Sequence, residues 1–310
     1  MIGRTLAIAM NTYREAVRAR VLLGLLAFAI GASLYSLVIA SMSVRQESRI
    51  VADLGSASIS LLSVLTAIIL GATSLYRELE LKTVFPILTR RLRRHEYVVG
   101  KFLGIVATLV VFVAVDGAVT LAILGVQAKE HATQSLVGAG VLLLALAILL
   151  VRAKLTRVYV LFPWSLAAFA TMAILASSAG VERQIVLVSC LLTIAEVAIV
   201  TAVAMLFSSF SSPFLTAIFT VMVFLIGRSA DTLGNLPERV FGSSLRSIGM
   251  VLARIFPNLF LYVPSRPVLL GQVPGVPLTV YVAQAWGNAL LYSAVLLVAS
   301  AIVFRRRDFQ

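Results

Sequence analysis

Long uncharged apolar runs recur along the chain and are separated by short charged segments. A helix needs roughly 20 residues to cross a bilayer core about 30 Å thick, and alternating strands of the barrel type are absent, so the pattern predicts an all-α polytopic membrane bundle. We expect eight spanning helices, near residues 21–43, 57–76, 102–126, 136–151, 158–178, 185–207, 214–226 and 283–304. The fourth and seventh runs are short enough for re-entrant or interfacial segments, which makes the expected range six to eight.

Composition excludes an ordinary soluble enzyme. Apolar residues make up 60% of the 310 positions and charged residues 13%, against about 45–50% and about 25% in soluble domains. The chain has one cysteine, Cys190, which lies inside an expected span. A disulfide within the chain and a cysteine-based metal site are therefore excluded, and we expect no metal site.

The formal net charge of +13 would suggest a nucleic-acid partner in a soluble protein. With an even number of spans, however, both termini lie on one side and the loops fall into two sets. The set with the termini carries 17 of the 26 Lys and Arg residues, and the positive-inside rule assigns that side to the cytoplasm. The basic excess then faces anionic membrane lipid, and no nucleic acid is needed to explain it.

The N-terminal arm, residues 1–20, has an amphipathic pattern. Leu6, Met10 and Tyr13 share one helical face with Val17, which favours a helix lying flat in the membrane interface. The alternative is a plain cytosolic extension of the first span. Arginines stand directly before that span and no small-residue cleavage site follows, so we expect the arm to be retained. Residues 21–310 then form the transmembrane domain.

The cytoplasmic loop 77–101 is too charged to span the membrane and too apolar for a solvated linker. Its apolar residues favour a short amphipathic helix with a kink at Pro86, and Glu78 and Glu80 would lie favourably in the first turn. Such an element suits the docking of a soluble partner. The alternative is that the arginines between positions 90 and 94 anchor the loop to lipid.

The segment 228–282 is the one sizeable stretch between spans on the opposite side. Apolar residues recur in it at helical spacing while Arg239, Arg246 and Arg254 fall on the other face. The pattern predicts an amphipathic helix on the outer leaflet. Its apolar positions are Phe241, Leu245, Ile248, Leu252 and Ile255.

Two acids, Asp116 and Glu196, lie well inside expected spans, where a charge costs at least about 2.5 kcal/mol unless it is paired or faces water. They are candidate polar sites on a translocation path. Alternatively, each is protonated or hydrogen-bonded to a neighbouring helix. The expected spans place no Lys or Arg deep enough to pair with them. Small residues spaced for close helix contacts, a pattern common by chance, occur at Gly24 and Gly31 and at Gly100 and Gly104.

Motifs that carry chemistry are absent from the sequence. The one Gly-Lys pair, Gly100 and Lys101, is followed by Phe102, so the chain has no phosphate-binding loop. His-Glu-x-x-His, Gly-x-Ser-x-Gly and acid clusters that would hold a metal and a diphosphate are also missing. We therefore expect no catalytic residues and no cofactor in this chain.

The 77–101 loop carries a resemblance to a known family through three motifs, Glu78-x-Glu80-x-Lys82-Thr83, Ile87-Leu88-Thr89-Arg90 and Arg94-x-Glu96-Tyr97-x-x-Gly100-Lys101. It is similar to the cytoplasmic loop of type-2 ATP-binding-cassette (ABC) exporter permeases, in particular the branch associated with multi-copper enzyme maturation. The N-terminal arm and the tail 304–309 extend the likeness. Lys82 and Arg91 depart from the family's usual Gly and Pro, and the pair of spans within 136–178 exceeds the family's usual six.

The resemblance implies a non-catalytic permease subunit of an ABC exporter in the bacterial inner membrane. In such exporters two permeases, identical or related, join two ATPases that bind ATP and Mg. The loop acts as a coupling helix on the ATPase, and substrate leaves by alternating access between the permeases. The implied ATPase-facing residues are Glu78, Glu80, Thr83 and Phe85, and the outer gate consists of Phe241, Leu245, Ile248 and Leu252. The alternative is an ATP-independent channel, a secondary transporter or an anchor of a periplasmic complex.

Overall fold

The computed structural model describes residues 2–43, 46–80, 94–128, 132–153, 156–273 and 277–306, and these residues form helices and connecting turns without strands. In chain order the elements are α1 (Ile2–Val17), α2 (Arg20–Ser41), α3 (Glu47–Glu80), α5 (Arg94–Gln127), α6 (Ala132–Arg152), α7 (Arg157–Leu175), η1 (Ala176–Ala179), α8 (Gly180–Ser208), α9 (Pro213–Arg228), α10 (Ala230–Gly234), α11 (Glu238–Ile255), η2 (Leu259–Tyr262), α12 (Arg266–Leu269) and α13 (Leu278–Arg306).

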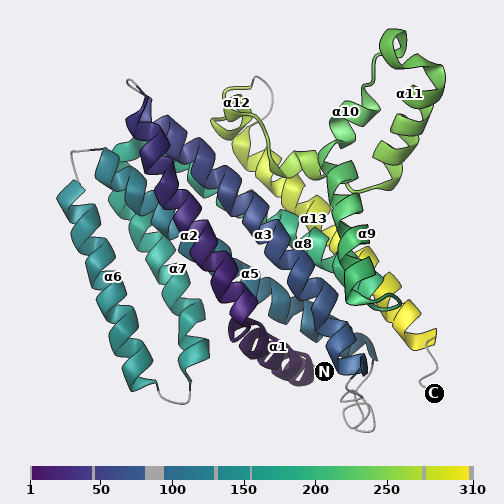
Figure 1. The fold of residues 1–310 in the computed structure, drawn as a ribbon, viewed down its shortest axis with the longest axis horizontal. Coiled ribbons are helices and arrows are strands. Elements are labelled where there is room, and N and C mark those ends of the chain that lie inside the picture. Colours follow the sequence, from purple (N-terminus) through teal and green to yellow (C-terminus); the bar gives the residue numbers. More distant parts are fainter. Residues whose placement is uncertain are drawn as a thin grey trace.

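Six stretches of the described chain are long and apolar enough to cross a membrane, and the longest, over residues 157–208, has 52 residues. This is far more than one crossing needs. It consists of α7 and α8, between which the chain turns back at η1 and at Gly180, whose φ is +51° (Figure 1). With the shorter apolar α9, the helices follow the eight expected runs, and the prediction of an all-α polytopic bundle is confirmed.

The two ends of the described chain lie on the same side of the bundle (Figure 1), where α1 crosses the ends of the other helices and α13 finishes. This placement is what an even number of crossings requires. The expected extra pair of spans is the α6–α7 hairpin, which packs on α5. The chain is therefore a multi-pass membrane protein with its termini on one side.

Helix α8 forms the centre of the bundle and packs against α3, α5 and α13. It is apolar around most of its circumference, which is the pattern of a helix enclosed by others. Helix α6 is the opposite case, because Ser135 is its one buried residue. It lies at the edge of the bundle beside α7 (Figure 1), where its apolar side chains face lipid.

Helix α1 lies flat across the end of the bundle and packs on α5 (Figure 1). The expected amphipathic helix is present, but only part of its expected apolar face is buried. Tyr13 and Val17 are buried, whereas Leu6 and Met10 are exposed. The helix contacts α5 through Ile8, Ala9 and Thr12, and Tyr13 packs on the rings of Tyr159 and Phe162 in α7.

The close approach of α1 and α5 depends on two glycines of α5. A Cβ atom on Gly104 would lie 2.5 Å from the Ala9 carbonyl oxygen and 2.6 Å from Thr12 Cβ, and one on Gly100 would lie 2.8 Å from Ile8 Cβ. Small residues let helix backbones approach this closely. Gly24 and Gly31 have open space around them, so only one of the two glycine pairs in the sequence makes such a contact.

We expect Gly104→Leu to separate α1 from α5 and to lower the free energy of unfolding by about 1–3 kcal/mol, the usual range for overpacking. Gly31→Leu adds the same side chain at a position where a Cβ would meet no atom of a neighbouring helix within 4 Å, and it should change little. Thermal unfolding of both purified variants in detergent measures the difference. Equal midpoints for the two variants would show that the α1–α5 contact contributes no stability.

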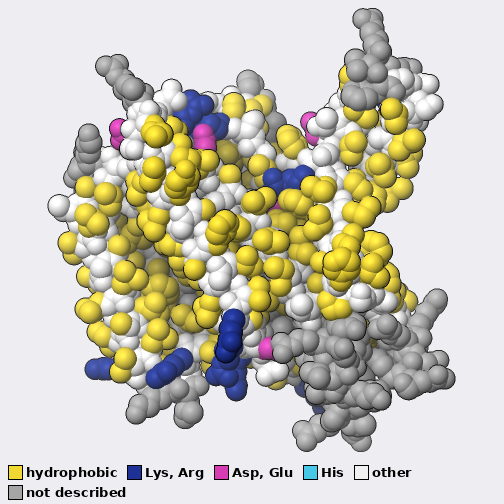
Figure 2. All heavy atoms as spheres, viewed as in Figure 1, with side chains coloured by type: hydrophobic (Ala, Val, Ile, Leu, Met, Phe, Trp, Pro, Cys, Tyr) yellow, Lys and Arg dark blue, Asp and Glu magenta, His cyan; other side chains and the backbone are white. Residues whose placement is uncertain are grey.

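Apolar side chains cover most of the face shown in Figure 2, and the lower edge of this apolar surface carries basic side chains. The described arginines at that end of the helices include Arg14 and Arg18 on and after α1, Arg20 at the start of α2, Arg152 at the end of α6 and Arg157 at the start of α7. A belt of this kind is typical of a protein in a bilayer, with its basic residues at the interface.

Candidate functional site

The expected coupling loop is described only at its two flanks. Glu78 and Glu80 belong to the last turn of α3, but their side chains lie outside the described residues. Thr83 and Phe85 fall in residues 81–93, which also lie outside them. The assignment of these four residues to an ATPase contact therefore stays a prediction, and the described flanks show what the loop is attached to.

The flanks of the loop are joined to each other and to the bundle. Lys101, in the second turn of α5, is buried and donates hydrogen bonds from Nζ to the backbone oxygen and to Oγ of Ser74 in α3. Tyr97 stacks on Phe304 near the end of α13, with ring centroids 6.1 Å apart. These contacts join the start of α5 to α3 and to the end of α13.

Glu196, in the middle of α8, forms a buried ion pair with Arg228 at the end of α9. Arg228 Nε lies 2.7 Å from Glu196 Oε1, and its Nη2 lies 3.0 Å from Oε2. Ser60 of α3 completes the cluster, since its hydroxyl donates to Glu196 Oε2 at 3.2 Å and accepts from Arg228 Nη2 at 2.6 Å. The Glu196 side chain has no exposed area and that of Arg228 is 25% exposed. Three helices meet at this charged contact.

The expectation that no basic residue reaches the intramembrane acids is wrong for Glu196. The sequence places Arg228 in the outer segment, because the apolar run before it ends at Ile226. In the structure α9 has 16 residues and is about 24 Å long, less than the bilayer core of about 30 Å. Its last residue therefore ends inside the bundle at the depth of Glu196. The ion pair and the hydrogen bond from Ser60 offset part of the cost of burying these charges.

Asp116, in α5, occupies a separate and fully buried position. Its Oδ1 accepts a hydrogen bond from Ser33 Oγ of α2 at 2.9 Å, and Thr120 lies 3.3 Å from the same hydroxyl. Its Oδ2 has no hydrogen-bond partner among the described residues. Asp116 and Glu196 thus belong to two sites with different partners, and in this conformation neither side chain has exposed area. Their place on a translocation path stays a prediction.

The outer segment contains the expected amphipathic helix, α11, which projects from the bundle together with α10 (Figure 1). Leu245 and Ile248 are exposed and Leu252 is partly buried, whereas the side chain of Phe241 lies outside the described residues. The helix is held on α10 through Gly249, where a Cβ would lie 2.6 Å from the Leu233 carbonyl oxygen. The apolar face of α11 is thus available to lipid or to a partner, and its role as an outer gate stays a prediction.

A second charged contact joins the loop before α13 to the bundle. Arg266 of α12 donates from Nη2 to both carboxylate oxygens of Glu182 in α8 at 2.6 Å, and its Nη1 pairs with Asp53 of α3. Sequence reasoning missed this contact, because the three residues are separated by more than 80 positions and no local pattern connects them. In the described part of the chain, no group of three His, Cys, Asp or Glu residues is placed to hold a metal ion.

No protein-family model matches the chain, and no curated protein matches it. The resemblance to ABC exporter permeases therefore rests on the sequence motifs of the 77–101 loop, the N-terminal arm and the tail, and it stays a prediction.

Proposed function

We propose that this chain is the transmembrane permease subunit of an ABC exporter of the bacterial inner membrane. It moves its substrate with ATP that a separate pair of ATPases binds with Mg and hydrolyses, and two permeases form the transport unit. The side that carries the termini, α1 and the 77–101 loop faces the cytoplasm, in agreement with its excess of Lys and Arg.

The observation that carries this proposal is the packing around the 77–101 loop. The loop joins two helices of 34 residues each, α3 and α5, and each is about 50 Å long. Within three turns of the start of α5, its glycines contact α1 and its Lys101 contacts α3. An ATPase that pushes on the loop therefore moves an interfacial helix and two long spanning helices at once. This is the mechanical linkage that ATP-driven alternating access needs.

Co-purification tests the proposal. The full chain carrying an affinity tag is co-expressed with an ATP-binding-cassette ATPase of the same host, extracted in mild detergent and purified through the tag. We expect the ATPase in equal amount with the permease, and ATP hydrolysis that changes when the permease is reconstituted in lipid. An isolated permease that transports without any ATPase would instead establish the ATP-independent alternative.

A further inference from the structure

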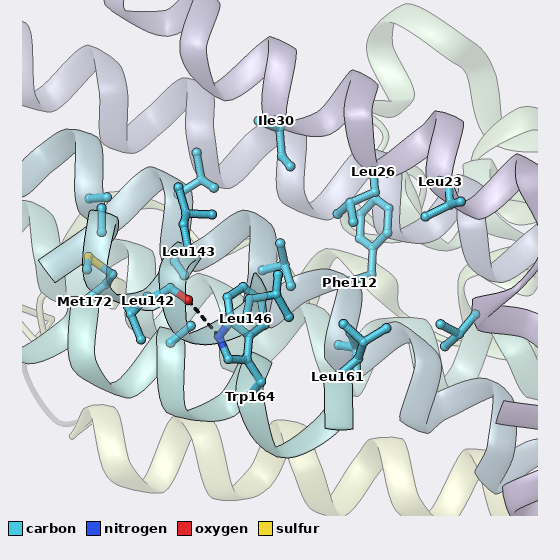
Figure 3. Close-up of a pocket in the computed structure, with 18 of the residues that line it drawn as sticks. Leu23, Leu26, Ile30, Phe112, Leu142, Leu143, Leu146, Leu161, Trp164 and Met172 are labelled. Atoms are coloured by element: carbon cyan, nitrogen blue, oxygen red, sulfur yellow. Dashed lines mark hydrogen bonds between the residues drawn. The ribbon is translucent and has the colours of Figure 1, made fainter. Parts of the chain in front are cut away.

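A groove of about 390 Å³ runs along the outside of the bundle between α2 on one side and α6 and α7 on the other, with α5 at its base. Figure 3 shows the side chains of these helices pointing toward one another across it. Leu23 on α2 and Leu143 on α6 lie at its edges and are 58% and 65% exposed. The groove therefore opens sideways, toward the lipid that surrounds α6.

The wall of the groove offers no free hydrogen-bonding group. Its two polar side chains are satisfied within the protein, since Trp164 Nε1 donates to the Leu142 carbonyl oxygen at 3.1 Å (Figure 3) and Thr108 Oγ1 donates to the Gly104 carbonyl oxygen at 2.9 Å. The remaining lining residues are apolar. A polar solute would lose its hydration there without compensation, whereas a hydrocarbon chain would not.

The length of the groove matches a lipid chain. Its base extends along α5 from Thr108 to Ala122, which is about 20 Å at 1.5 Å per residue. The hydrocarbon of one leaflet is half of a core about 30 Å thick. The groove is therefore long enough to hold one acyl chain over the full hydrocarbon thickness of a leaflet.

The same three helices that form the sides of the groove each carry an arginine at the end nearest the cytoplasmic side. Arg20 begins α2, Arg152 ends α6 and Arg157 begins α7, and all three are exposed. A lipid whose chain lay in the groove would hold its headgroup at this level. The three guanidinium groups favour a phosphate with a net negative charge over a zwitterionic headgroup.

We propose that this groove is a binding site for an anionic phospholipid, with an acyl chain between α2, α6 and α7 and its phosphate among Arg20, Arg152 and Arg157. The site requires only that the bundle lies in a membrane, and it is independent of the export function. A bound chain would fill the space between α6 and α2 and would add to the contacts that α6 already makes with α5 and α7.

Lipid retention tests this site. The full chain is reconstituted in nanodiscs of phosphatidylglycerol and phosphatidylcholine in equal amounts, re-extracted, and examined by native mass spectrometry for bound lipid. We expect phosphatidylglycerol to exceed phosphatidylcholine by at least about fivefold, the effect of one Lys or Arg near the headgroup. Leu146→Trp places a larger side chain in the groove about 9 Å from Arg152 along α6. It should reduce total retention about tenfold, as the exclusion of about two methylenes would.

Matched variants separate the site from general lipid affinity. Leu144→Trp makes the same change on α6 at an exposed position outside the groove, and this variant should retain lipid as the wild type does. Arg20→Gln, Arg152→Gln and Arg157→Gln together should abolish the preference for phosphatidylglycerol. Arg246→Gln with Arg254→Gln, on α11, removes exposed positive charge from a helix that does not line the groove and should keep the preference. Equal retention of both lipids by the wild type, or undiminished retention by Leu146→Trp, would overturn the proposal.

Discussion

Replacing Glu196 with Gln is expected to lower the free energy of unfolding by about 3 kcal/mol, the lower end of the range for breaking a buried ion pair. The carboxylate accepts two hydrogen bonds from Arg228 and one from Ser60. The side chain of glutamine carries one oxygen and no charge. Its NH2 group would face the guanidinium, and the largely buried positive charge of Arg228 would lose its counter-charge. Unfolding of the purified protein in mixed micelles measures the loss.

Three further variants make this result specific. Glu47→Gln changes an exposed acid in the first turn of α3 and should alter stability by less than about 0.5 kcal/mol. Asp116→Asn keeps an oxygen that accepts from Ser33 and should cost less than about 1 kcal/mol. The double variant Glu196→Gln, Arg228→Gln should lose less stability than the two single variants lose in sum. If the two changes instead add without coupling, the ion pair does not hold α8 and α9 together.

Reversing the charges at Glu78 and Glu80 to Lys is expected to uncouple ATP hydrolysis from transport while the permease still inserts and folds. The two acids end α3 and belong to the proposed ATPase contact. Loss of about 1.4 kcal/mol from that contact corresponds to a tenfold weaker docking, so transport should fall about tenfold or more. Substrate transport and ATP hydrolysis are measured together in proteoliposomes that contain the ATPase.

The matched control for this reversal lies on the same helix. Glu47→Lys places a reversed charge at the other end of α3, about 50 Å from Glu80 by the rise of 1.5 Å per residue, and it should leave coupling unchanged. The amount of folded protein, followed by size-exclusion chromatography, should be equal for all variants. Full coupled transport by the Glu78→Lys, Glu80→Lys variant would exclude these residues from the ATPase contact.

The positions of the spanning helices were predictable from local sequence, because a bilayer selects for uninterrupted apolar runs of a set length. The expected runs coincide with α2 through α9 and α13, and the extra pair is the α6–α7 hairpin. The amphipathic patterns of α1 and α11 were equally visible. Which residues of α1 would be buried was not, since that depends on where Gly100 and Gly104 of α5 allow a close approach.

The same distinction between local sequence and tertiary packing applies to single residues of the candidate sites. By itself, the sequence determined that Asp116 and Glu196 lie inside helices in a membrane, and that the charged 77–101 loop joins two long spans on the basic side. Only the tertiary structure decided that Arg228 pairs with Glu196, that Arg266 joins Asp53 to Glu182, and that α2, α6 and α7 leave a groove. The physical reason is that hydrophobic runs are local properties of a segment, whereas a charge pair or a groove depends on the depth and spacing of helices that are distant in the chain.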